Sequence, residues 1–122
     1  MSGSILTVDD SPSIRVAIRI ALAAAGYQVS EAADGAEGVR QVKSNKFDLI
    51  ITDLNMPVMN GLAMIETLRK SPEGAGVPII FLTTESDADM KARAKAAGAT
   101  GWITKPFEAA QLVKIVNKVL GK

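Results

Sequence analysis

Five polar side chains that could do chemistry lie just beyond four short apolar stretches of this sequence. They are Asp9 and Asp10 after residues 5–8, Asp53 after residues 49–51, Thr83 after residues 78–82, and Lys105 after residues 101–104. Short apolar runs rich in β-branched residues are typical of strands buried inside a parallel sheet. Open α/β sheets bind ligands at the carboxyl ends of their strands. The sequence therefore predicts that these five side chains converge in one crevice.

Three carboxylates in one crevice repel one another unless one is protonated or a cation is bound. We favour a cation, and Mg²⁺ in particular, because a few oxygen ligands completed by water suit it better than zinc or calcium. A divalent ion, an amine, a hydroxyl and a spare carboxylate together are typical of phosphoryl transfer, in which a carboxylate attacks in line. Asp53 is the best candidate nucleophile, because it stands alone at the end of the central apolar strand.

Each of these residues also has an ordinary structural explanation when it is taken alone. An acidic pair such as Asp9-Asp10 often begins a helix or lies in a solvated loop. Asp53 could form an Asx turn, and Pro106 could simply end a strand. The coincidence of polar residues at the ends of four buried strands favours a functional site.

The composition excludes several other classes of protein. The chain has 122 residues, 48% of them hydrophobic, and a net charge of +1, which indicates a single domain spanning residues 1–122 with no electrostatic preference for nucleic acid or membrane. It has no cysteine and no histidine, so disulfides, zinc fingers and Ser-His-Asp triads are excluded. Residues 1–4 lead straight into an apolar strand without a basic segment, so we expect a cytoplasmic location.

Strand and helix patterns alternate along the whole chain. Strands are predicted over residues 5–8, around Val29, and over residues 49–51, 78–82 and 101–104, and helices over residues 12–25, 35–46, 61–69 and 86–98 and after residue 107. Ser11 and Asp34 are typical N-caps, and Gly26 and Gly98 are typical helix ends. This alternation predicts an α/β fold, a doubly wound five-stranded parallel sheet with helices on both faces.

In combination, these residues resemble the signature of two-component response-regulator receiver domains. The signature consists of Asp9-Asp10, Asp53 with Met56-Pro57 and Gly61 after it, Thr83, and Lys105-Pro106-Phe107. The resemblance covers essentially the whole chain and is greatest to stand-alone chemotaxis receivers of the CheY type. It implies the flavodoxin-like strand order 2-1-3-4-5, which is the order in CheY itself.

The resemblance also implies a role for each position of the site. Asp53 would accept the phosphoryl group, and Asp10, Asp53 and the backbone carbonyl of Asn55 would bind Mg²⁺. Asp9 would act mostly through a metal-bound water. Thr83 and Lys105 would hold the phosphoryl oxygens.

Receivers switch when their threonine moves toward the phosphoryl group and an aromatic residue on the fifth strand turns inward. Trp102 occupies that aromatic position here, where tyrosine or phenylalanine is usual. The small residues Ala92 and Ala96 of the fourth helix are expected to leave room for the larger indole. The family typically has a cis peptide bond at Lys105-Pro106.

Two partners follow from the family resemblance. Because the chain has no histidine, a separate histidine kinase or histidine phosphotransfer protein must donate the phosphoryl group. We expect no output domain, so output would be a changed affinity for a target protein, in chemotaxis or, alternatively, in another phosphorelay or adaptor pathway. We expect a monomer that is not an enzyme and that phosphorylates and dephosphorylates only its own aspartate.

Two surfaces are predicted to bind these partners. Val16 and Ile20, with Ala23, form a second apolar row on the first helix, which is predicted to dock the donor. Scattered apolar residues on a surface are also commonplace. The target is predicted to bind the fourth helix, fifth strand and fifth helix. Its contact residues there would be Trp102, Lys91, Lys95 and Lys114.

Asn55 and Glu85 bear on the lifetime of the phosphoryl group. In receivers, the residues two positions after the acceptor and two after the switch threonine admit or orient the hydrolytic water. The polar side chains at these positions predict a comparatively short lifetime, as suits chemotaxis.

Two other classes of protein share parts of the pattern. An aspartate-nucleophile phosphatase of the haloacid dehalogenase type needs a carboxylic acid two residues after its nucleophile, and Asn55 cannot donate a proton in that role. A flavodoxin-like nucleotide carrier needs glycines in its first loop, and residues 8–12 are acidic and lack them.

Overall fold

The computed structural model describes residues 3–84 and 88–121. Five strands form one parallel sheet: β1 (Ser4–Val8), β2 (Gln28–Ala32), β3 (Leu49–Thr52), β4 (Ile79–Thr83) and β5 (Gly101–Thr104). Five helices alternate with them: α1 (Pro12–Ala24), α2 (Gly35–Ser44), α3 (Gly61–Arg69), α4 (Ala88–Ala97) and α5 (Ala109–Leu120). The strand order is β2-β1-β3-β4-β5, which confirms the predicted doubly wound fold.

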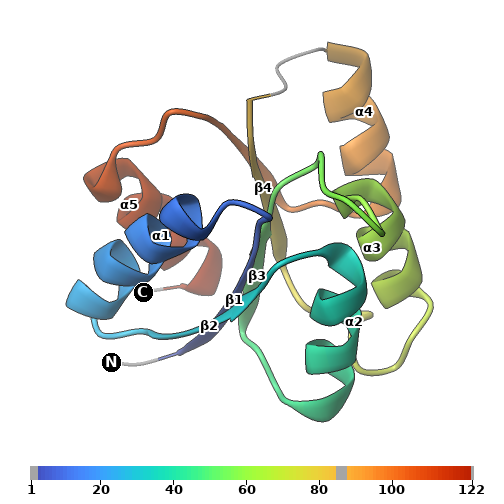
Figure 1. Cartoon of the computed structure of the whole chain (residues 1–122), viewed down its shortest axis with the longest axis horizontal. Helices are drawn as coiled ribbons and strands as arrows, with labels where there is room; N and C mark the ends of the chain where they lie inside the picture. The colour runs from blue at the N-terminus through green and yellow to red at the C-terminus, as the bar shows by residue number, and fades with distance from the viewer. Residues whose placement is uncertain (1–2, 85–87, 122) are drawn as a thin grey trace.

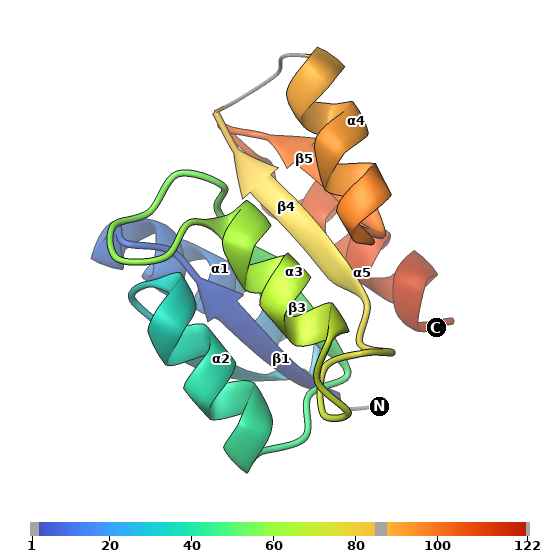
Figure 2. The ribbon, with the colours of Figure 1, turned by 90° about the vertical axis from the view of Figure 1, so that its right-hand side faces the viewer.

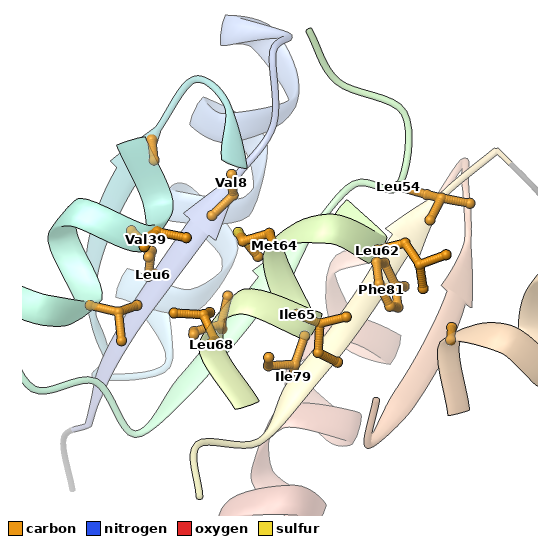
Figure 3. Close-up of a cluster of buried hydrophobic side chains, with 14 residues drawn as sticks. Leu6, Val8, Val39, Leu54, Leu62, Met64, Ile65, Leu68, Ile79 and Phe81 are labelled. Atoms are coloured by element: carbon orange, nitrogen blue, oxygen red, sulfur yellow. The ribbon is translucent and has the colours of Figure 1, made fainter. Parts of the chain in front are cut away.

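The helices cover both faces of the sheet. Helices α1 and α5 lie on one face, and α2, α3 and α4 lie on the other (Figures 1 and 2). Alternate residues of the buried strands supply the two cores. Ile50, Ile79 and Phe81 pack under α2, α3 and α4 (Figure 3), whereas Ile51 and Ile80 pack under α1 and α5.

Short polar side chains begin the helices at the predicted places. Ser11 and Asp34 accept the backbone N–H groups of Ile14 and Glu37, as N-caps do. Asn60 caps α3 in the same way, accepting the backbone N–H of Ala63. The start of the helix predicted over residues 86–98 lies outside the described residues.

Arg69 has a structural role that the sequence did not suggest. Its guanidinium donates hydrogen bonds to the carbonyls of Gly74, Val77 and Gly98, at 2.7, 2.8 and 2.8 Å. Burial lowers the pKa of Arg69 below its ordinary value. The side chain thereby holds the connection after α3 against the end of α4.

None of the described helices is both long and apolar enough to serve as a transmembrane span.

Candidate functional site

The ends of β1 and β3 bring three carboxylates together. Asp9 and Asp10 follow β1, and Asp53 follows β3, its direct neighbour in the sheet. Each of the three offers a carboxylate oxygen within 4.8 Å of the others. Asp9 and Asp53 are buried, whereas Asp10 is exposed. The predicted crevice therefore forms, with an all-oxygen donor set that could hold a divalent cation.

Lys105 reaches the same crevice from the end of β5. Its Nζ lies 2.9 Å from Asp9 Oδ2 and 3.0 Å from Asp53 Oδ2, so one ammonium bridges both buried carboxylates. Burial, the largest single influence, lowers the pKa of Lys105, but hydrogen bonds and charge interactions with Asp9 and Asp53 together raise it above its ordinary value. The lysine thus relieves the repulsion that we expected protonation or a metal ion to relieve.

Backbone N–H groups fix the remaining carboxylate oxygens. Asp53 Oδ1 accepts the N–H of Leu54 at 2.6 Å and that of Asn55 at 3.4 Å. Asp9 Oδ1 accepts the N–H of Ser11 at 2.9 Å. The two buried carboxylates are therefore held on both oxygens before any ligand arrives.

Thr83 is fully buried at the last position of β4. The N–H of Lys105 donates to the Thr83 carbonyl at 2.8 Å, so the loops after β4 and β5 are tied together beside the carboxylates. The Lys105-Pro106 peptide bond is cis, as the resemblance implied. The side chains at the carboxyl ends of the strands are thus Asp9, Asp10, Asp53, Thr83 and Lys105.

Comparison with known proteins identifies the family. Residues 5–117 match the response regulator receiver domain. The chain belongs to this family. A receiver domain is a phosphorylation switch and not a catalytic enzyme, so membership of this family excludes the phosphatase alternative.

Relatives of this receiver include single-domain and longer proteins. The chemotaxis response regulator CheY4 of Vibrio cholerae is 42% identical, with a TM-score of 0.93 over 98% of this chain and 100% of CheY4. Protein PilH of Pseudomonas aeruginosa is 35% identical over 95% of this chain and 96% of PilH. The transcriptional regulatory protein PrrA of Mycobacterium tuberculosis and that of Mycobacterium bovis are each 34% identical to this chain. The chain spans 50% of their length.

One similar structure contains a metal ion. The receiver domain of the sensor histidine kinase PA1611 from Pseudomonas aeruginosa is 31% identical, with a TM-score of 0.91 over 100% of both chains. A magnesium ion is coordinated in its active-site cleft.

Trp102 lies on the α4 side of the receiver sheet and Ile103 on the opposite side, because side chains alternate along a strand. Its ring centroid is 5.7 Å from that of Phe81, and Lys91 Nζ lies 5.8 Å from the indole centroid. The indole N–H is buried and has no hydrogen-bond acceptor among the described residues. A small pocket beside β5 is lined by Lys91, Lys95 and Trp102, so these three residues share one surface.

One expectation about this surface is wrong. Ala92 and Ala96 are exposed, and Ala94 is the buried alanine of α4 that packs in the core with Trp102, because α4 turns that residue toward the sheet. Lys114 lines the groove between α1 and α5 together with Ile20, and its contact with the target stays a prediction.

The apolar row on α1 is exposed, as the sequence suggested. Val16 is 37% exposed and Ile20 is 63% exposed. Ile20 borders the groove between α1 and α5, and half of the residues that line this groove are alanines. Asn55 is also exposed, whereas Glu85 lies outside the described residues.

Proposed function

We propose that this receiver is a phosphorylation-activated switch whose phosphoacceptor is Asp53. The observation that carries the proposal is the convergence of Asp9, Asp10 and Asp53 within 4.8 Å, with Lys105 bonded to two of them. A histidine kinase or histidine phosphotransfer protein supplies the phosphoryl group. An oxygen of Asp53 attacks the phosphorus, the P–N bond breaks, and the imidazole keeps the electron pair. The product is an acyl phosphate on Asp53.

The donor set fits Mg²⁺, which would neutralise phosphoryl oxygens when bound. Asp10, Asp53 and the Asn55 carbonyl would hold the ion, and Asp9 would act through a bound water. The PA1611 receiver, with magnesium in its cleft, supports this proposal. Lys105 would turn from the Asp53 carboxylate to a phosphoryl oxygen, and Thr83 would hold another. The ammonium of Lys105 would neutralise negative charge on the phosphoryl group, and the neutral hydroxyl of Thr83 would donate a hydrogen bond to it.

Acetyl phosphate with Mg²⁺ tests the proposed function directly. We expect one hydroxylamine-labile phosphoryl group per chain by mass spectrometry, and no labelling of Asp53→Asn. Labelling should require Mg²⁺. Multiple turnover of added phosphoesters, or unchanged labelling of Asp53→Asn, would contradict the proposal.

We also propose that the chain works as a single domain in the cytoplasm, as a monomer, and signals by binding a target protein in chemotaxis. CheY4, a chemotaxis protein, and PilH, which matches over nearly its whole length, support this assignment. A phosphorelay or adaptor role outside chemotaxis is the alternative. Capture of partners with and without beryllofluoride, which mimics the phosphoryl group, distinguishes these roles.

The exposed Asn55 supports a short phosphoryl lifetime.

Ile20→Glu tests the donor surface formed by Val16 and Ile20. Because Ile20 is 63% exposed, a charge there leaves the core unchanged but disfavours an apolar interface. We expect transfer from the cognate donor to slow by roughly tenfold, as for loss of an interface residue worth about 1.4 kcal/mol. Labelling by acetyl phosphate is the internal control. An equal loss of transfer from the donor and of labelling by acetyl phosphate would indicate that the variant is misfolded and that its docking surface is not the cause.

Tryptophan fluorescence tests the target surface formed by Lys91, Lys95 and Trp102. Since the indole N–H has no acceptor among the residues described, inward rotation of the ring would give it a new environment. We expect emission to change when beryllofluoride and Mg²⁺ are added, and Asp53→Asn to abolish the change. If emission is identical in both states while target binding still depends on beryllofluoride, Trp102 does not rotate on activation.

A further inference from the structure

Asp10 differs from the other two carboxylates of the site. It is exposed, and no hydrogen bond or ion pair holds its carboxylate among the residues described in the structure. Asp9 and Asp53 are instead buried and bonded on both oxygens. A ligand without side-chain partners can be oriented only through its backbone.

The two peptide groups that flank Asp10 are both held. The carbonyl of Asp9, which belongs to the preceding peptide, accepts a hydrogen bond from Arg15 Nη1 at 2.5 Å. The N–H of Ser11, which belongs to the following peptide, donates to Asp9 Oδ1 at 2.9 Å. Arg15 is therefore the only side chain outside the loop, among the described residues, that bonds the backbone on which Asp10 is carried.

Arg15 is itself fixed by the edge strand of the sheet. Its Nε donates to Glu31 Oε1 at 3.1 Å, and Gln41 Nε2 donates to the Glu31 carbonyl at 2.7 Å. The side chain of Arg15 is 17% exposed and that of Glu31 is 24% exposed. Arg19 Nη1 also donates to Glu31, but it makes no bond to the Asp9 carbonyl.

We propose that Arg15 is a positioning residue for the metal ligand Asp10, with Glu31 as the group that orients Arg15. This inference rests on the Mg²⁺ site of the proposed function. It assigns the β2 edge strand a part in metal binding, although β2 supplies no ligand. Groups that orient metal ligands typically change metal affinity by about 10- to 100-fold when they are removed.

Arg15→Met and Arg19→Met form a matched pair, because each removes one positive charge that pairs with Glu31. Coulomb's law alone predicts tighter Mg²⁺ binding in both variants. Loss of positioning predicts the opposite for Arg15→Met only. We expect Mg²⁺, titrated by calorimetry, to bind Arg15→Met roughly tenfold more weakly than the parent and Arg19→Met no more weakly. Equal shifts in the two variants, or tighter binding by Arg15→Met, would overturn the proposal.

A metal-free measurement separates this inference from the proposed function. By NMR relaxation, the backbone order parameter of the Asp10 amide should fall from about 0.85 in the parent toward about 0.6 in Arg15→Met, and stay unchanged in Arg19→Met. An unchanged order parameter in a folded Arg15→Met would refute the positioning role. Failure of the parent to bind Mg²⁺ would refute the metal site itself and leave the order parameter to decide the role of Arg15 in the loop.

Discussion

Gly61→Ala is expected to lower the free energy of unfolding by about 3 kcal/mol, as for overpacking of a tight site. Gly61 begins α3 directly above the end of β3. A Cβ there would lie 2.2 Å from the Asp53 carbonyl oxygen and 2.7 Å from Phe81 Cε1. Phe81 lies in the core beside Leu62 (Figure 3), so neither neighbour can yield without moving the sheet or α3. Phosphorylation should fall as well, because the contact displaces the backbone of Asp53.

Gly76→Ala is the matched control. Apart from Gly76 itself and its two chain neighbours, no residue has an atom within 4 Å of a Cβ built there, so the same substitution should be neutral or stabilise by about 0.4–1 kcal/mol through the unfolded state. Urea unfolding of both variants measures the difference. A Gly61→Ala variant as stable as Gly76→Ala would mean that the start of α3 moves freely away from the acceptor.

The fold could be predicted from local patterns, but the order of its strands could not. The alternation of helix and strand follows from the spacing of apolar residues, and helix ends follow from residues such as Ser11 and Gly26, because caps act over a few residues. Strand order is a relation between distant segments. We took it from the resemblance to receivers, and the structure confirms it.

Contacts between distant elements account for what the sequence analysis missed. Arg15 and Arg69 both bond backbone carbonyls, which every residue carries, so no sequence pattern marks them. The wrong placement of Ala96 arose because α4 has no clear apolar stripe, so its rotation cannot be judged from spacing.

Lys105→Met is expected to lower the free energy of unfolding by about 2 kcal/mol near neutral pH, as for loss of hydrogen bonds between charged groups. Methionine keeps the apolar stem but leaves the buried carboxylates of Asp9 and Asp53 without their shared ammonium. Lys114→Met is the control, because Lys114 is exposed and has no ion pair among the described residues. Millimolar Mg²⁺ should stabilise Lys105→Met more than the parent, since the cation then meets no competing ammonium.

The pH dependence of this loss identifies its cause. The carboxylates of Asp9 and Asp53 raise the pKa of Lys105 above its ordinary value of 10.5, despite the opposing effect of burial. Because the pKa of Lys105 is higher in the folded state, its ammonium contributes fully to the free energy of unfolding below the unfolded-state pKa. That contribution is lost as the pH rises through the higher folded-state pKa. The stability difference between the parent and Lys105→Met should therefore be constant from about pH 7 to about pH 9 and shrink above about pH 11, as measured by urea unfolding. A difference that persists unchanged into strong alkali would mean that the positive charge of Lys105 contributes nothing to the free energy of unfolding.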